Sequence, residues 1–262
     1  MPLHLLDGRP WQDSAWVDPL SLLGCYTSFV VDGEGEVVDL PGHLERLRRD
    51  SALLLGREVD VELVRRRAAD HVARVGAPVR LRVAVLAQTP PLQPQDVRAL
   101  HLATSSRPVP PEPDRAWSVQ TVQHVRTLPV VKAVDPYVQL HLKREARLAG
   151  HDDALLCRGD ALLEGTTWGL VALTATAAVA PQDDVLLSSG VTRVLRAAGL
   201  PVQRRALRRA ELADVRLLVA SNAVVTATAV ARVDEQDLFV DLDLLAALRQ
   251  VSREERGVRL TG

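Results

Sequence analysis

Two lysines are the residues of this chain whose chemistry is hardest to replace. The 262-residue sequence holds 32 lysines and arginines, yet only Lys132 and Lys143 are lysines. Either cation serves on a surface, but a reaction that needs a deprotonated amine, such as imine formation, excludes arginine because a guanidinium stays charged. Lys143 lies among charged residues in HLKREAR, which predicts a solvated helix face. Lys132 is therefore the candidate catalytic residue.

Other reactive side chains lie in short motifs around the lysine. Lys132 begins the segment KAVDPY, which ends at Tyr137, and the other of the two tyrosines, Tyr26, lies in GCYTSF. The motif HLERL places Arg46 on a predicted helix. A guanidinium suits a phosphate because it donates parallel hydrogen bonds and stays ionised. Taken alone, the motif favours an ordinary exposed helix arginine at Arg46, and Tyr137 is equally compatible with a residue packed on a helix.

Two further segments have the form of phosphate-binding turns. SSGVTRVLRAAG predicts a helix that begins near Val191 and Thr192, whose backbone N–H groups and helix dipole favour an anion. The turn with Asn222 and Ala223 follows the predicted strand LLVAS. Either could be a plain helix cap or loop. Between Lys132 and these turns, DALLCRGDALLEGTTWGL predicts two strands joined at a turn and contains Glu164.

Together, in this order and spacing, these segments resemble the class IV aminotransferases, the fold-type IV enzymes that use pyridoxal 5′-phosphate (PLP). The resemblance runs from about Gly24 to Asp234. It implies that Lys132 is the Schiff-base lysine, that Tyr137 meets the phenolic oxygen of the cofactor, and that Glu164 pairs with its pyridine nitrogen. Such a carboxylate keeps the nitrogen protonated, so that the ring can accept electrons.

The same resemblance assigns the phosphate and substrate contacts. Arg46 grips the cofactor phosphate, joined by the main chain of Val191 and Thr192, while Asn222 and Ala223 form a second turn near the phosphate and the substrate carboxylate. The substrate-facing residues implied are Tyr26, Thr27 and Arg82, with Arg80 a further carboxylate candidate on VRLRVAVL; outer-face surface charge is the alternative for both arginines. Gly169 and Pro136 depart from the family, which often has asparagine there.

The reaction is open between three alternatives. GCYTSF is similar to the GCFTT-like sequence of 4-amino-4-deoxychorismate lyases, which release pyruvate and 4-aminobenzoate for folate biosynthesis, and Thr27 replaces a glutamate common in aminotransferases. An amino-acid aminotransferase of the branched-chain or D-amino acid type is the second reading. A relative without catalysis is the third, and the retention of Lys132 argues against it. The substrate class is a small molecule with an amino group, and its identity and stereochemistry stay open.

The elements that must position these residues predict an α+β protein of two domains. Helices over 43–55, 61–75 and 136–148 and a strand over VRLRVAVLA alternate irregularly, without regular βαβ units. The proline-rich stretch RPVPPEPDRAW predicts a linker. The linker therefore predicts two domains, over 1–112 and 118–262. The family resemblance implies that the first is a small N-terminal domain and the second a larger PLP-binding domain with a barrel-like sheet.

Composition excludes several other classes of protein. A net charge of −1 argues against a nucleic-acid partner, and no apolar run is long enough to span a membrane. The N-terminal residues lack the pattern of a secretory signal, and two cysteines are too few for a disulfide framework, so a cytoplasmic location is expected. The seven histidines are dispersed, which predicts no metal site. The family resemblance implies a homodimer.

Overall fold

The computed structural model describes residues 3–11, 23–87, 99–134, 136–186 and 188–261. Two compact units divide the chain: the first consists of residues 1–109, 131–135 and 256–262, and the second of residues 110–130 and 136–255. A single boundary at the proline-rich stretch therefore does not separate the two units. Residues 131–135 and 256–262 follow that stretch in the sequence but belong to the first unit. Among the described residues, no helix has the length and apolarity needed to cross a bilayer.

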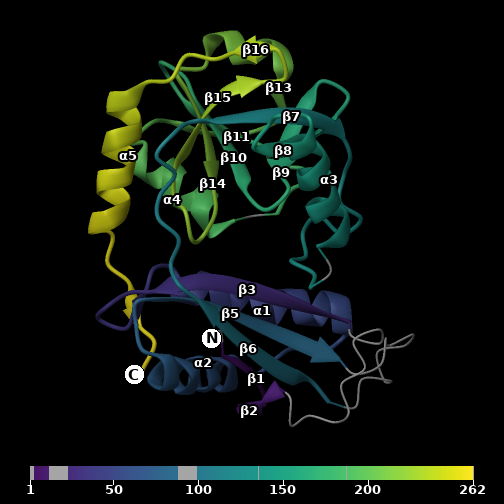
Figure 1. Ribbon diagram of the computed structural model, residues 1–262, viewed down its shortest axis with the longest axis vertical. Helices are drawn as coiled ribbons and strands as arrows, with labels where there is room; N and C mark the ends of the chain where they lie inside the picture. Colours follow the sequence, from purple (N-terminus) through teal and green to yellow (C-terminus); the bar gives the residue numbers. More distant parts are fainter. Residues whose placement is uncertain (1–2, 12–22, 88–98, 135, 187, 262) are drawn as a thin grey trace. The chain divides into compact units, whose positions relative to one another are not determined.

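The first unit is a sheet covered by two helices on one face (Figure 1). Its five strands follow the order β2-β1-β6-β5-β3, all paired antiparallel. Their bounds are Arg9–Pro10, His4–Leu6, His101–Arg107, Val79–Ala87 and Leu23–Val31. The helices are α1 (Leu40–Leu55) and α2 (Val61–Val75), and a small ribbon pairs β4 (Glu36–Val37) with β17 (Val258–Arg259).

Alternation along β3 decides which side chains reach the helices. Successive residues of a strand point to opposite faces, so Phe29 and Val31 enter the core beneath α1 and α2, whereas Tyr26 lies among residues of the other face. The helix predicted at 43–55 begins one turn earlier, at Leu40, and ends at Gly56 in a left-handed conformation with φ of 67°. Glycine adopts this conformation without strain, which explains the stop.

The second unit is built on a barrel-like sheet. Six strands form a ring in the order β10-β14-β15-β7-β8-β9, and the ring closes where Gly169 of β10 pairs with Glu164 of β9. Their bounds are Gly169–Leu173, Leu217–Ser221, Thr228–Val233, Trp117–Gln123, Asp153–Arg158 and Ala161–Gly165. The remaining strands β11 (Ala178–Ala180), β12 (Val202–Arg204), β13 (Leu207–Arg208) and β16 (Gln236–Asp237) extend the sheet.

Apolar side chains fill the second unit on both sides of this sheet. One cluster includes Val119, Leu155 and Leu170, and a second packs α4 (Ser189–Ala197) and α5 (Leu242–Glu254) against β10 and β14. The other helices are α3 (Tyr137–Leu148), close to the predicted bounds, and a short 3-10 helix, η4 (Arg209–Asp214). Strands and helices mix without regular alternation, so the α+β prediction is confirmed.

Candidate active site

Lys132 lies on a short segment hydrogen-bonded to β3 in the first unit. The amide of Tyr26 donates to the Lys132 carbonyl at 2.9 Å, and the amide of Val134 donates to the Gly24 carbonyl at 2.9 Å. Between these bonds, Ala133 pairs with Cys25 in an antiparallel bridge. Val131 anchors the segment because its side chain is buried in the core of the first unit. The backbone around the lysine is therefore fixed.

Tyr26 and Arg82 lie close to the lysine side chain. Lys132 Nζ is 5.0 Å from the centroid of the Tyr26 ring, and the guanidinium carbon of Arg82 is 4.5 Å from the same centroid. The negative face of an aromatic ring attracts cations at such distances. Next along the same strand face, burial lowers the pKa of Arg80, with the charge of Arg82 acting in the same direction. This face of the sheet thus gathers positive charge around one phenol.

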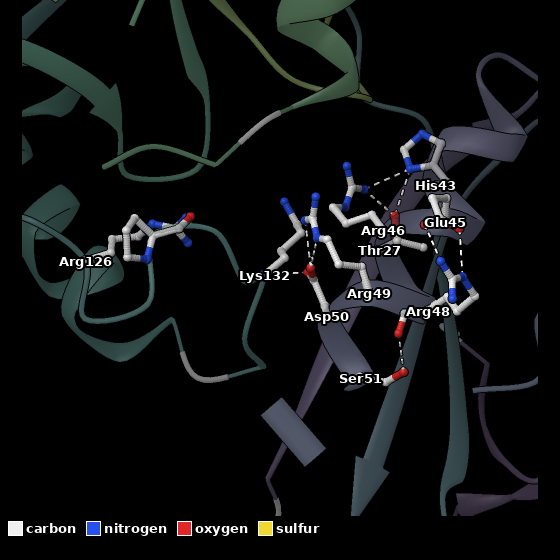
Figure 2. A network of polar contacts seen from close by, with 11 residues as sticks. Thr27, His43, Glu45, Arg46, Arg48, Arg49, Asp50, Ser51, Arg126 and Lys132 are labelled. Carbon is white, nitrogen blue, oxygen red and sulfur yellow. Dashed lines mark hydrogen bonds and ion pairs between the residues drawn. The ribbon is translucent and has the colours of Figure 1, made fainter. Parts of the chain in front are cut away.

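Thr27 lies on the opposite face from Tyr26, beneath α1 (Figure 2). It is fully buried, and its hydroxyl accepts a 2.5 Å hydrogen bond from Arg46 Nη2. His43 Nδ1 lies 2.8 Å from the same hydroxyl and 2.9 Å from Arg46 Nη2. Because a guanidinium can only donate, its contact with His43 requires an unprotonated Nδ1. Sequence reasoning placed Thr27 at the substrate, whereas its contacts here are with the candidate phosphate ligand.

Arg46 has a buried donor that an anion could satisfy. Its Nε is buried and has no hydrogen-bond partner among the described residues. Burial lowers the pKa of Arg46, and the charge of Asp50 partly opposes that effect. A buried donor without a partner is unfavourable, and an anion that accepted from it would relieve the penalty. The position predicted to hold a phosphate therefore fits one.

Glu164 is held by two donors in the second unit. Its Oε1 accepts a 2.8 Å bond from Arg126 Nε and its Oε2 a 3.0 Å bond from the amide of Leu186. The glutamate is buried on β9, so the arginine stabilises its ionised form. Sequence reasoning identified Glu164 but missed Arg126, because nothing in the spacing of the two residues marks them as partners.

The two predicted phosphate-binding turns pack against each other. A Cβ on Gly190, in the first turn of α4, would approach the main chain of Asn222 to 2.5 Å, so only glycine allows this contact. Asn222 closes its own turn by accepting from the amides of Val224 and Val225 at 2.8 and 2.9 Å. Ala223 lies within that turn. The structure therefore places the Val191 and Asn222 segments side by side.

Details of α4 bear on the predicted contacts of Thr192 and on the Gly169 departure. The Thr192 amide donates to the Ser188 carbonyl at 3.2 Å, and its hydroxyl lies 3.4 Å from the same oxygen. The main-chain donor predicted at Thr192 is therefore already used within the helix, which differs from the sequence expectation. The Val191 side chain explains the glycine, because a Cβ on Gly169 would approach Val191 Cγ2 to 2.3 Å. Any larger residue at 169 requires this valine to move.

Tyr137 is a predicted site residue whose side chain is largely exposed. It begins α3, is 74% exposed, and stacks on His141 with ring centroids 6.5 Å apart. Pro136 is the N-cap residue of the same helix. Its ring removes a backbone N–H at a position where the helix needs none. The proline departure is thus compatible with the local fold.

Comparisons with known proteins agree with this architecture. The model of the amino-transferase class IV family matches residues 24–233. No curated protein matches the sequence. Among solved structures, a branched-chain aminotransferase from Thermoproteus uzoniensis has a TM-score of 0.81 at 19% identity, covering 97% of this chain and 94% of its own.

Two other solved structures have the same fold. A putative 4-amino-4-deoxychorismate lyase from Legionella pneumophila has a TM-score of 0.78 at 15% identity, covering 88% of this chain and 91% of its own. A hypothetical aminotransferase from Mycobacterium tuberculosis, solved in a PLP-bound form, has a TM-score of 0.73 at 20% identity, covering 88% of each chain. With the family model spanning most of the sequence, the chain belongs to the class IV aminotransferase family of PLP-dependent enzymes.

Proposed function

We propose that this chain binds PLP through Lys132 and acts as a 4-amino-4-deoxychorismate lyase, releasing pyruvate and 4-aminobenzoate. The observation that carries the proposal is the arrangement around Lys132: its amine lies 5.0 Å from the Tyr26 ring, with Arg82 against the same ring. A substrate carboxylate suits this cationic face. Thr27 supports the lyase over the transaminase because its motif is similar to that of the lyases.

Each side chain has a definite task in this proposal. PLP, when bound, supplies an aldehyde and a ring that accepts the electron pair left at the substrate α-carbon. Lys132 provides the amine and moves the proton at that carbon. Glu164 holds a proton at the pyridine nitrogen, and Arg126 keeps the glutamate ionised and oriented. Tyr137 is the proposed partner of the phenolic oxygen.

The phosphate contacts are proposed for Arg46, Val191, Thr192, Asn222 and Ala223. We assign Thr27 a supporting role, since its hydroxyl engages Arg46 rather than a substrate-facing surface. The substrate is then oriented by Tyr26 and Arg82.

An amino-acid aminotransferase is the second candidate, favoured by the similarity in fold to branched-chain aminotransferases.

Borohydride treatment of the protein incubated with PLP, followed by peptide mapping, tests the step that both reactions share. The reduced adduct should lie on Lys132. The two reactions are then distinguished by product. Release of pyruvate and 4-aminobenzoate supports the lyase, whereas conversion of bound cofactor to its amine form by an amino acid supports the transaminase. A protein that takes up no PLP would instead be the non-catalytic relative.

We also propose a homodimer. The loop before α3 and α3 itself expose several large apolar side chains, between 42% and 74% of each: Leu128, Val130, Tyr137, Val138 and Leu140. So many exposed apolar groups within one stretch are unusual for a monomer, and a second copy of the chain is the partner expected. Sedimentation at micromolar concentration tests this, and a monomeric mass would contradict it.

A further inference from the structure

Asp50 is a fully buried carboxylate that contacts the backbone of the proposed catalytic lysine. It lies on α1, and its Oδ2 accepts a 2.9 Å hydrogen bond from the Lys132 amide (Figure 2). Its other oxygen, Oδ1, accepts from Arg49 Nε at 3.2 Å and Nη2 at 2.8 Å. The carboxylate thus joins the lysine segment to the helix that also carries Arg46.

The two polar groups of the Lys132 main chain are therefore held by different elements. The carbonyl accepts from Tyr26 on β3, and the amide donates to Asp50 on α1. A charged acceptor makes a stronger bond than a neutral one. A buried carboxylate is tolerated only with compensating charge, which Arg49 provides directly and Arg46 through its Coulombic interaction with Asp50.

We propose that Asp50 is a positioning residue, which fixes the Lys132 backbone and thereby the direction in which its amine is presented. The proposal rests on the assignment of Lys132 in the proposed function and deepens it. The Asp50 carboxylate bonds to the lysine main chain and to Arg49, so its effect is on the placement of the amine. Orientation of a reactive group within a narrow range accelerates bond formation.

The test compares Asp50→Ala with Asp50→Asn, using Arg48→Ala as the matched control. The asparagine oxygen can still accept a hydrogen bond from the Lys132 amide. The Arg49 guanidinium can hydrogen-bond to solvent instead, since its side chain is 39% exposed. Alanine leaves that amide without an acceptor. Arg48 lies on the same helix but pairs with Glu45 and Glu58 at the surface.

Two readings are taken on each protein. The first is hydrogen exchange of the peptide containing Lys132 in the cofactor-free protein, with a peptide of α2 as reference. The second is the rate at which added PLP becomes reducible by borohydride onto Lys132. For Asp50→Ala we expect hydrogen exchange to be about tenfold or more faster in the Lys132 peptide and unchanged in the α2 peptide, as for the loss of one hydrogen bond to a charged group. We also expect PLP to attach to Lys132 more slowly. Asp50→Asn should restore most of the wild-type exchange rate and most of the wild-type attachment rate.

The outcomes separate this proposal from the proposed function. If the wild-type protein links PLP to Lys132 and Asp50→Ala does so at the same rate with unchanged exchange, the positioning role is wrong and the function stands. If the wild-type protein forms no adduct on Lys132, both are overturned. Where Asp50→Ala does not fold, Asp50→Ser, whose hydroxyl is one atom shorter, gives the same two readings with the same interpretation.

Discussion

Lys143 Nζ lies 2.5 Å from Oδ2 of Asp153, a carboxylate with a fully buried side chain. The other oxygen of Asp153 accepts from the Thr166 hydroxyl at 2.6 Å and the Ala154 amide at 2.8 Å. The prediction of a solvated helix face for Lys143 is therefore wrong. The second lysine of the chain has a structural task, to neutralise a buried carboxylate that orders the turn after Glu164.

Replacing Lys143 by methionine should strongly destabilise the protein. It leaves Asp153 buried without its cation, which lowers the free energy of unfolding by about 3 kcal/mol. The double variant K143M/D153N removes the charge as well and should regain part of this loss. Denaturant unfolding of the cofactor-free proteins measures both. Equal stabilities of the single and double variants would argue against the ion pair.

Arg46→Lys should weaken PLP binding more than Thr27→Val does. Lysine cannot donate the two parallel hydrogen bonds of a guanidinium. The loss of such charge-assisted bonds corresponds to about tenfold to hundredfold weaker affinity for PLP. Thr27→Val removes only the hydroxyl that receives Arg46 Nη2. Titration of the cofactor-free variants with PLP gives the affinities. The reverse ranking would exclude Arg46 as the main phosphate ligand.

Glu164→Gln should slow turnover by about a hundredfold while PLP remains linked to Lys132, because an amide no longer holds a proton at the pyridine nitrogen. Arg126 and the Leu186 amide both donate to the present carboxylate, so the amide nitrogen must also face one donor. Steady-state rates at measured cofactor occupancy test this. Unchanged kcat would remove Glu164 from the mechanism.

Acid should destabilise the second unit through Asp234. Burial acts to raise the pKa of this carboxyl, but hydrogen bonds from Thr121 and pairing with Arg209 bring it below the ordinary value of 3.8. A lowered folded-state pKa gives stability that is present above 3.8 and is lost as the pH falls through the folded value. Asp234→Asn should therefore be less stable than wild type at neutral pH, with the difference shrinking below about pH 4. Thermal unfolding between pH 2.5 and 7 measures it.

The two thiols should be inert in the folded protein. Burial, with the charge of Asp50, raises the pKa of Cys25 from 9.0 to about 12, and burial also raises that of Cys157. A rise of this size lowers the thiolate fraction of Cys25 about a thousandfold below pH 9. A disulfide reagent at pH 8 should react with both thiols only after unfolding. Rapid labelling of Cys25 in the native state would contradict its burial.

Periodicity and turn residues predicted much of the fold, because these signals are local. The strand of alternating residues at 79–87 and the helix ending at Gly56 follow from patterns within a single element. The closure of the barrel at the Glu164 and Gly169 pair could not be predicted this way. It depends on the register of six strands rather than on any one of them.

The candidate site shows the same limit. Lys132 and Glu164 were identified because their motifs resemble those of a family. Asp50 and Arg126 were missed because they lie 82 and 38 residues from their partners, and a lone aspartate on a helix resembles a solvated one. The placement of Thr27 depended on which face of β3 it occupies, which the alternating pattern alone could have suggested.

The first unit draws its core from three separate stretches of chain. Val131 and Leu260 pack with residues of α1, α2 and β5. In addition β17, which lies close to Leu260 in the sequence, pairs with β4. During synthesis on the ribosome, this unit cannot close its core until residue 260 has emerged, although its sheet is made first. A fragment cut at the proline-rich stretch would lack both apolar side chains, so the first unit can complete its core only after the second unit has been synthesised.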